Sequence, residues 1–299
     1  MTRILGIVCV VMVATFSLSA QGQSAAENQL TALIRCDDIG MCHAVNTAFR
    51  EVVASGLPVS ASVMFACPWY QEAVKLLKEH PEVSVGIHLT LNAEWQNYRW
   101  GPVSGKEAVP SLVDSVGYFF PSRALLFAHE PKLQEVEHEL RAQIERALGT
   151  GLRIDYVDYH MGAAVQTLPM RELVERLAKE YGLAISRYYG EQDVPGVYDA
   201  PIEHKLDTLL SVSEKITPDH INLFVFHVGE ETPEMNALVD FNSFGPRDMS
   251  KHRHAELNAL ISPAFRALME KMGVKFVTYR DLNRTLGLDK MKRPDVTDM

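Results

Sequence analysis

The chain has 299 residues, of which 47% are hydrophobic and 22% are charged, and its formal net charge is −9 at pH 7. This is an ordinary globular composition, and the length suits one domain of barrel size or two smaller ones. Because the chain is acidic and has no dense run of Lys or Arg, nucleic acid and anionic membrane surfaces are not expected partners.

The first twenty residues have the organisation of a secretory signal peptide. Arg3 supplies a positive charge, Ile4 to Leu18 form an apolar stretch, and small residues precede a polar segment that begins at Gln21. The apolar stretch is shorter than the roughly 20 residues that a membrane-spanning helix needs. We therefore predict a signal peptide over residues 1–20, a single domain over residues 21–299, and a secreted or periplasmic mature protein without a membrane anchor.

Removal of the signal peptide would leave three cysteines, Cys36, Cys42 and Cys67. An odd number cannot pair completely within one chain, and three cysteines do not make a disulfide scaffold in a domain of this size. We expect buried thiols, and the alternative is a bridge from Cys36 or Cys42 to Cys67.

Strand-like and helix-like patterns alternate along the rest of the chain. Apolar and β-branched runs predict strands at residues 30–36, 58–65, 83–89, 154–160, 183–189, 221–228 and 274–279. Apolar residues at helical spacing predict helices at residues 45–56, 68–81, 133–149, 170–181, 203–216 and 262–273. Residues 92–128 show no clear periodicity, and a loop of this length in a compact domain is usually functional.

This alternation predicts an α/β fold with a parallel sheet. About seven strands, each followed by a helix or a long loop, favour a distorted or incomplete (β/α) barrel, and an open doubly wound sheet is the alternative. In a barrel of this kind, functional side chains gather at the C-terminal ends of the strands.

Polar residues stand at the ends of most of the predicted strands. Asp37 and Asp38 end the first strand, His88 the third, Asp158 and His160 the fourth, Arg187 the fifth and His227 the sixth. In a barrel all of them would meet at one rim. One carboxylate and two imidazoles would leave open positions on Zn²⁺ or a similar ion, as a catalytic metal site requires.

Two adjacent carboxylates can have separate tasks at such a site. One can bind the ion, and the other can take a proton from a water molecule whose pKa the ion has lowered toward about 7. His227 could then protonate the departing amine of an amide substrate, and we expect its ring on the opposite side of the barrel from Asp37. The alternative is that Asp37 and Asp38 only cap the helix that follows them.

The motifs resemble, in their order along the chain, those of the YdjC-like carbohydrate deacetylases, which include the chitooligosaccharide deacetylases. The matching segments are "DDIG", "VNTAFREVVASG", "SASVM", "GIHLTL", "DYVDYHMG", "FHVGE" and the closing "MGVKFVTYRDL", and together they run from about residue 31 to residue 285. The resemblance implies a distorted (β/α) barrel related to other polysaccharide deacetylases. It also implies metal-dependent removal of an N-acetyl group from an amino sugar by a single catalytic domain.

The resemblance also implies individual roles. Asp37 matches the general base; Asp38, His88 and His160 match the ligands of one divalent ion, Zn²⁺ or Mg²⁺; and His227 matches the histidine of a His-Pro-Gly segment. The chain departs from the pattern in three places. Val228 replaces the proline, Met161-Gly162 replaces a His-x-His continuation, and Cys36 replaces a more usual alanine before Asp37. The signal peptide is a further departure from the cytoplasmic members.

Other residues are weaker candidates. Arg187 could hold Asp37 or bind a substrate oxygen by charge-assisted hydrogen bonds. Aromatic residues of the long loop could stack on sugar rings or pack onto the barrel; they are Trp95, Tyr98 and Trp100. The charge-rich stretch "KHRHAEL", with His252 and His254, is expected to be solvated.

Two other functions are compatible with these residues. One is a metallohydrolase with another substrate, such as a phosphoesterase or a different amidase. The other is a sugar-binding protein that keeps the fold without catalysis. An N-acetylated sugar is the expected ligand under the main interpretation, and a homodimer is left open.

Overall fold

The computed structural model describes residues 29–243 and 245–295, so the predicted signal peptide lies outside the described residues. Eight strands form one sheet in this part of the chain, and every strand pairing is parallel. The strands are β1 (Thr31–Ile39), β2 (Ser60–Val63), β3 (Ser84–Leu89), β4 (Tyr156–Tyr159), β5 (Ala184–Ile185), β6 (Glu191–Asp193), β7 (Ile221–Phe226) and β8 (Lys275–Val277).

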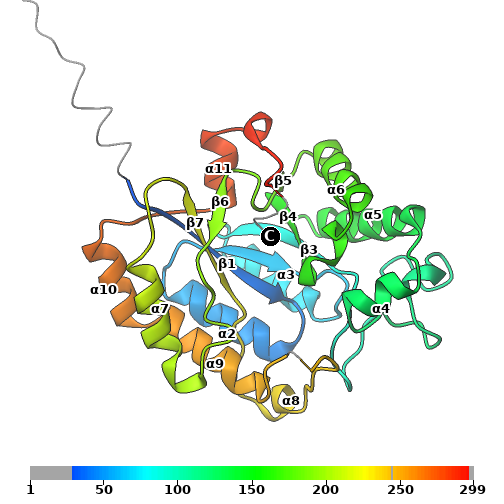
Figure 1. Cartoon of the computed structure of the whole chain (residues 1–299), viewed down its shortest axis with the longest axis horizontal. Coiled ribbons are helices and arrows are strands. Elements are labelled where there is room, and N and C mark those ends of the chain that lie inside the picture. Colours follow the sequence, from blue (N-terminus) through cyan, green and yellow to red (C-terminus); the bar gives the residue numbers. More distant parts are fainter. Residues whose placement is uncertain (1–28, 244, 296–299) are drawn as a thin grey trace, which may run out of the picture.

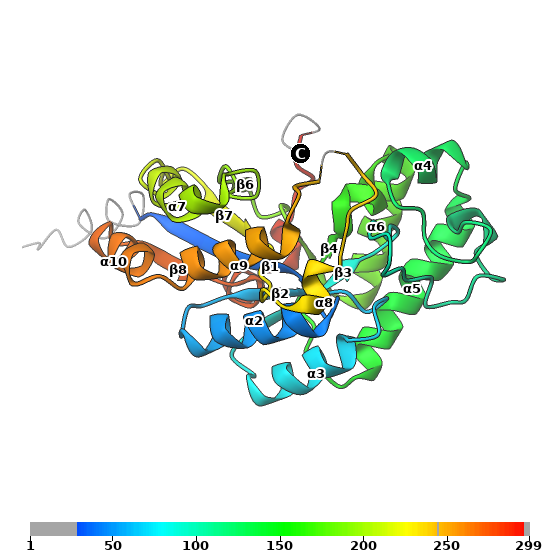
Figure 2. The same ribbon diagram turned by 90° about the horizontal axis from the view of Figure 1, so that it is seen from below.

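The sheet is an incomplete barrel. Its order is β5-β4-β3-β2-β1-β7-β6, and β8 pairs with the first residues of β1. The short strands β5 and β6 are therefore the two ends of the sheet. Figure 1 shows the strands in the middle of the molecule with helices around them, and Figure 2 shows α2 and α3 along its lower side. The prediction of a distorted or incomplete (β/α) barrel is confirmed.

Helices follow most of the strands. They are α2 (His43–Ala54), α3 (Tyr70–Glu79), α4 (Arg123–Ala128), α5 (Leu133–Gly149), α6 (Leu168–Tyr181), α7 (Lys205–Ser213), α8 (Pro233–Asn236), α9 (Met249–Leu260), α10 (Pro263–Lys271) and α11 (Tyr279–Thr285). Four short 3₁₀ segments in the described residues are η1 (Pro110–Leu112), η2 (His160–Val165), η3 (Ile202–His204) and η4 (Leu288–Lys290). None of these helices is long and apolar enough to cross a membrane.

The central strand β1 is apolar on both faces where it enters the sheet. Ala32, Leu33 and Ile34 are fully buried, as expected for a parallel strand covered on both sides. The α10 helix begins as predicted, because the Ser262 side chain accepts a hydrogen bond from the Phe265 N–H and proline occupies the first helical turn.

The predicted strand at residues 183–189 is much shorter than expected. Only Ala184 and Ile185 pair, because Arg187 adopts a left-handed φ of 72° and turns the chain. The Glu191 carboxylate accepts the backbone N–H groups of Arg187 at 2.9 Å and Tyr189 at 2.6 Å, which stabilises this turn. Strand β6 then begins at Glu191 and was not predicted.

The "KHRHAEL" stretch is part of α9 and is not the fully solvated segment that was predicted. Arg253 and Glu256 are 3% and 1% exposed, while His252 and His254 are partly exposed. The prediction failed because charged residues at helical spacing usually mark an exposed face. In this helix Arg253 and Glu256 point into the protein and contact the residues described next, whereas Lys251 is exposed.

Candidate active site

Asp37 and Asp38 point to different partners because β1 is irregular at its end. The register between β1 and β2 shifts between Cys36 and Ile39, and Asp38 has a left-handed φ of 62°. Neither carboxylate caps α2, whose N-cap residue is Cys42 and has no side-chain capping bond. The helix-capping alternative is therefore wrong.

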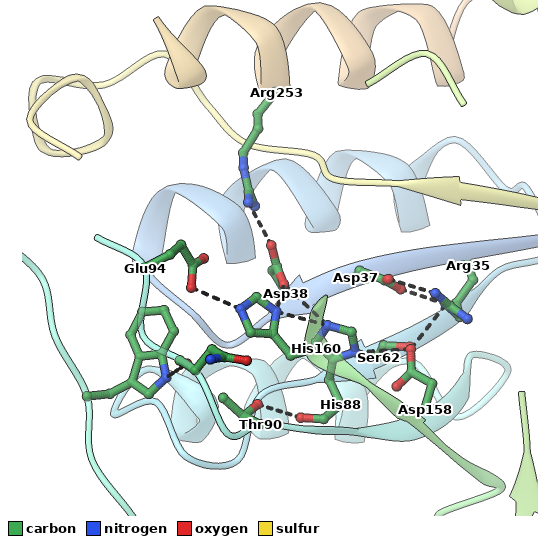
Figure 3. A network of polar contacts seen from close by, with 12 residues as sticks. Arg35, Asp37, Asp38, Ser62, His88, Thr90, Glu94, Asp158, His160 and Arg253 are labelled. Atoms are coloured by element: carbon green, nitrogen blue, oxygen red, sulfur yellow. Dashed lines mark hydrogen bonds and ion pairs between the residues drawn. The ribbon is translucent and has the colours of Figure 1, made fainter. Parts of the chain in front are cut away.

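Asp38, His88 and His160 come together at the ends of β1, β3 and β4 (Figure 3). The Oδ1 atom of Asp38 lies 3.4 Å from Nε2 of His88 and 3.3 Å from Nδ1 of His160. The two ring nitrogens are 3.3 Å apart. The three atoms thus form a nearly equilateral triangle, and their side chains are almost completely buried.

This triangle has the dimensions of a tetrahedral metal site. Ligand atoms about 2.0–2.1 Å from a tetrahedral Zn²⁺ lie about 3.3 Å from one another. Three ligands at right angles around an octahedral Mg²⁺ would lie only about 2.9 Å apart. The residues therefore fit a divalent ion with one carboxylate and two imidazole ligands.

Each histidine of the triangle has a carboxylate at its other ring nitrogen. Nδ1 of His88 lies 3.0 Å from Oδ2 of Asp158, and Nε2 of His160 lies 3.0 Å from Oε2 of Glu94. Such carboxylates fix the tautomer and the ring orientation of metal-binding histidines. Each ring is therefore oriented to present its remaining nitrogen to Asp38.

The carboxylates also change the acidity of the two rings. Burial alone would lower the pKa of His88, but Asp158 and Asp37 raise it to about 10. Burial likewise opposes protonation of His160, and Glu94 and Asp38 raise its pKa to about 9. In the metal-free protein both rings are therefore in the positively charged imidazolium form at neutral pH.

Arg253 of α9 binds the other carboxylate oxygen of Asp38. Its Nη2 donates to Oδ2 at 2.6 Å, and both side chains are buried. Burial favours the neutral acid, but the Arg253 charge and the two histidines hold the pKa of Asp38 well below its usual range. Asp38 is thus ionised, with one oxygen held by Arg253 and Oδ1 facing the histidines.

Arg35 holds Asp37 in a bidentate ion pair. Its Nε and Nη2 atoms donate to the two carboxylate oxygens of Asp37 at 2.7 and 2.8 Å, and Nε is also 3.2 Å from Asp158. Burial favours the neutral form of Asp37, but Arg35 lowers its pKa to about 2. Asp37, His88 and Asp158 are a second group with suitable metal-binding atoms, but Arg35 already compensates the two carboxylates.

His227 follows the strand next to that of Asp37. Strands β7 and β1 pair directly, with Cys36 opposite Phe226, so the expectation of a position across the barrel from Asp37 is wrong. The His227 backbone N–H donates to Glu256 at 2.9 Å, and its ring contacts the ring of Tyr198. Its Nδ1 atom is buried without a hydrogen-bond partner in the described part of the chain.

A cavity of about 540 Å³ opens over these groups. Its lining includes Asp37, Asp38, His88, His160 and His227, so the structure brings five of the six predicted site residues to one cavity. Arg187 instead lines an adjoining cavity with Asp37, and its Nε donates to Asp193 at 2.9 Å. The residue that holds Asp37 is Arg35.

The long loop after β3 contributes to the same cavity. Trp95 is 1% exposed and lines the cavity, whereas Trp100 is buried and donates its Nε1–H to the carbonyl of Asn92 at 2.7 Å. Tyr98 donates its hydroxyl to the carbonyl of Met41. Tyr98 therefore ties the loop to the residues that follow β1, Trp100 bonds within the loop, and of these three aromatic residues only Trp95 lines the cavity.

The three cysteine thiols are buried and free, so the disulfide alternative is wrong.

Four charged residues of the site were not assigned a role from the sequence. They are Arg35, Glu94, Asp158 and Arg253. Arg35 was detectable in principle, because alternation along a strand places it on the same face as Asp37. Asp158 was recognised only as a residue at the end of a strand. No local pattern pointed to Glu94 or Arg253.

The chain matches the YdjC-like protein family model over residues 31–271. It belongs to this family. The carbohydrate deacetylase of Geobacillus stearothermophilus is 30% identical over 262 residues, which cover 83% of this chain and 96% of that protein. The carbohydrate deacetylase of Brevibacillus brevis is 36% identical over 166 residues, which cover 54% of this chain and only 61% of that protein.

Solved structures share the fold. A protein of Enterococcus faecalis V583, described as a cellobiose-phosphate cleavage protein, superposes with a TM-score of 0.71 at 22% identity over 85% of this chain and 99% of that chain. A peptidoglycan N-acetylglucosamine deacetylase superposes with a TM-score of 0.50 at 11% identity over 89% of this chain and 92% of that chain. The expected relation to the polysaccharide deacetylase fold is thus confirmed.

Proposed function

We propose that this protein is a metal-dependent carbohydrate deacetylase that hydrolyses the N-acetyl group of an amino sugar. One observation supports this most strongly. Three metal-binding atoms lie within 3.4 Å of one another at a strand-end rim, and Asp37 lines the same cavity without belonging to that triangle. Membership of a family whose named relatives are carbohydrate deacetylases supports the same reaction.

Asp38, His88 and His160 would hold one divalent ion. When bound, such an ion lowers the pKa of a water molecule and polarises the carbonyl of the amide. Two imidazole ligands suit Zn²⁺ better than Mg²⁺, which prefers oxygen ligands, and the triangle has tetrahedral spacing. We therefore propose Zn²⁺ as the better-fitting ion.

Asp37 would act as the general base. Its ion pair with Arg35 keeps it ionised at neutral pH, so it can accept the proton of the attacking water. The water oxygen forms a bond to the acetyl carbon, and the carbon–nitrogen bond then breaks. Because its pKa is low, Asp37 is a weak base. Its contribution would come mainly from its position in the cavity and its negative charge.

His227 would donate a proton to the departing nitrogen, so that acetate and a free amine leave. Its position beside Asp37 on the neighbouring strand places it on the same cavity wall. The Glu256 carboxylate fixes its backbone, and Tyr198 packs against its ring. These contacts fix His227 in the cavity wall, which is the position that a proton donor to the substrate requires.

Acetate release is the direct test. Metal-free protein would be incubated with N-acetylated amino-sugar oligomers, with Zn²⁺ or Mg²⁺ added, and with phosphate esters as a second substrate class. We expect acetate release that depends on the metal and is abolished in His88→Ala. Hydrolysis of phosphate esters alone would favour a phosphoesterase. Tight sugar binding without hydrolysis under all metals would favour a sugar-binding protein.

We also propose that the protein is exported. The charged, apolar and small-residue segments of residues 1–20 support this. Amino-terminal sequencing of the native protein should find a first residue close to Gln21. Recovery of the chain from the cytosol with Met1 intact would contradict export.

A further inference from the structure

A buried lysine lies behind the part of the cavity wall that carries His227. Lys205 is the first residue of α7 and is only 1% exposed. It lines neither the cavity over the metal triangle nor the adjoining one. A lysine loses hydration when it is buried, and the N-terminus of a helix disfavours a positive charge. The position of Lys205 is therefore unfavourable unless neighbouring groups compensate its charge.

Three acceptors surround the amine of Lys205. Its Nζ atom donates to the backbone carbonyls of Val197 and Tyr198, both at 2.7 Å. It also lies 3.4 Å from Oε1 of Glu256 in α9, whose side chain is equally buried. The helices α7 and α9 pack against each other (Figure 1). Lys205 thus joins both helices to the segment that precedes η3.

Both sides of this arrangement reach His227. The second carboxylate oxygen of Glu256, Oε2, accepts the backbone N–H of His227 at 2.9 Å. On the other side, the ring of Tyr198 packs against the imidazole with the ring centroids 5.3 Å apart and the planes at 64°. Lys205 therefore binds the side chain that holds the His227 backbone and the main chain that carries the neighbouring ring.

The same face of α9 also serves the metal triangle. Arg253 lies one turn before Glu256 and donates to Asp38 at 2.6 Å. Residues three positions apart share a face of a helix. The helix thus presents one buried charge to the metal-binding carboxylate and another to the residue that follows β7. Metal content therefore distinguishes a disturbance at Asp38 from one confined to His227.

We propose that Lys205 is a positioning residue for His227. Through Glu256 and the backbone of residues 197–198, it holds the imidazole at the place in the cavity wall from which a proton is donated. The inference rests on the proposed function, because the role of His227 as the acid belongs to that proposal. A buried ion pair is weak evidence for stability, since well-packed apolar side chains often serve as well. The fixed directions of its hydrogen bonds, which place groups on two sides of His227, explain the pair better.

The dependence of the rate on the leaving group tests this. In Lys205→Met, kcat on an N-acetylated amino-sugar oligomer should fall by roughly tenfold to a hundredfold, because a small displacement of a catalytic group has an effect of this order. KM and metal content should stay close to wild type, and an activated aryl acetate should be affected much less. Lys215→Met is the matched control, because Lys215 is an exposed lysine just after α7. It should change neither rate.

A double-mutant cycle separates positioning from general support of the fold. If Lys205 acts through His227, then Lys205→Met should change the amide rate of His227→Ala by less than about twofold. An equal loss in both backgrounds, or an equal loss on the amide and the aryl ester, would overturn the proposal. If Lys205→Met does not fold because Glu256 is left buried without its cation, Glu256→Gln answers the same question. Its single oxygen can replace only one of the two carboxylate oxygens, so the same selective loss is expected.

Hydrogen exchange keeps this inference separate from the proposed function. By NMR, the backbone N–H of His227 should exchange at least about tenfold faster in Lys205→Met than in the wild type, whereas that of Leu223, within β7, should keep its rate. This result would support the positioning role even if the wild type released no acetate, an outcome that would contradict the proposed function alone. Unchanged exchange at His227, or an equal increase at both residues, would overturn the inference and leave deacetylation intact.

Discussion

The Nε2 atom of His160 lies 3.0 Å from Oε2 of Glu94, a residue of the long loop after β3. The loop therefore takes part in the site, because its carboxylate orients a ring whose other nitrogen faces Asp38 and His88 (Figure 3). Asp158 has the same relation to His88. The two histidines are thus supported from opposite sides, by a loop and by a strand.

Replacing Glu94 should weaken metal binding without removing a metal-binding residue. In Glu94→Gln the ring of His160 loses its charged partner, and loss of such a contact typically lowers metal affinity by about 10-fold to 100-fold. Calorimetric titration of the metal-free variant with Zn²⁺ measures the change. Glu107→Gln is a suitable control, because Glu107 is an exposed residue of the same loop. Unchanged affinity in Glu94→Gln would mean that the 3.0 Å contact does not support the metal site.

The adjacent carboxylates should be separable by mutation. Asp38→Asn removes a charge from the triangle and should lose the metal. Asp37→Asn should keep the metal and the fold, because Arg35 can still hydrogen-bond the amide oxygen, but turnover should fall by about 10² to 10⁴ because the amide cannot accept a proton. Elemental analysis and acetate release measure the two effects. Loss of metal from Asp37→Asn would place that residue among the metal ligands instead.

The predictable part of the site consists of side chains that stand directly after strands. The apolar runs that form β1, β3 and β4 are evident in the sequence, and parallel strands bring their ends to one rim, so Asp38, His88 and His160 could be expected to meet. Arg253 could not be expected there. It is 215 residues from Asp38 in the sequence. It also lies in a charge-rich helix whose sequence pattern does not indicate a buried face.

Local backbone geometry was equally hard to predict. The register shift at the end of β1 and the left-handed φ of Asp38 direct the carboxylate of Asp37 to Arg35 and that of Asp38 to Arg253. No sequence pattern marks an irregularity at that position. Similarly, the turn at Arg187 depends on the carboxylate of Glu191, four residues further along the chain, which accepts two backbone N–H groups. The strand propensity of residues 183–189 was outweighed by these contacts.

Metal binding should release protons. Burial lowers the pKa of both histidines, but the neighbouring carboxylates raise the pKa of His88 to about 10 and that of His160 to about 9. Both rings are therefore protonated in the metal-free protein below about pH 9, whereas a metal binds the deprotonated nitrogen. Each bound ion should displace about two protons near pH 7, so that affinity rises by about a hundredfold per pH unit there and levels off above about pH 10.

Calorimetry in two buffers with different heats of ionisation counts these protons. The observed heat of Zn²⁺ binding at pH 7 should differ between the buffers by about two proton equivalents. Glu94→Gln provides an internal comparison, since removing that charge should lower the pKa of His160 and reduce the number of protons released. Heats that are identical in both buffers would show that the histidines are already neutral before the metal binds.

His227 should matter most when the leaving group needs a proton. The residue ends β7 beside Asp37, its backbone is held by Glu256 and its ring contacts Tyr198, so the imidazole is well positioned but is not part of the metal triangle. His227→Ala should therefore keep the metal and lower the rate of amide hydrolysis by about 10² to 10⁴, the usual contribution of a general acid. An activated aryl acetate, whose leaving group departs as an anion, should be affected much less.

Both substrates would be measured with the same metal-loaded preparations. His220→Ala is a suitable control, because His220 lies just before β7, at the opposite end of the strand from the cavity. It should leave both rates at the wild-type level. If His227→Ala slowed the amide and the aryl ester by the same factor, the imidazole would be acting on a step common to both, such as substrate placement or stabilisation of the attacked carbonyl. A loss of metal from the variant would instead make His227 a support of the metal site. Only a selective loss on the amide identifies proton donation to the leaving nitrogen.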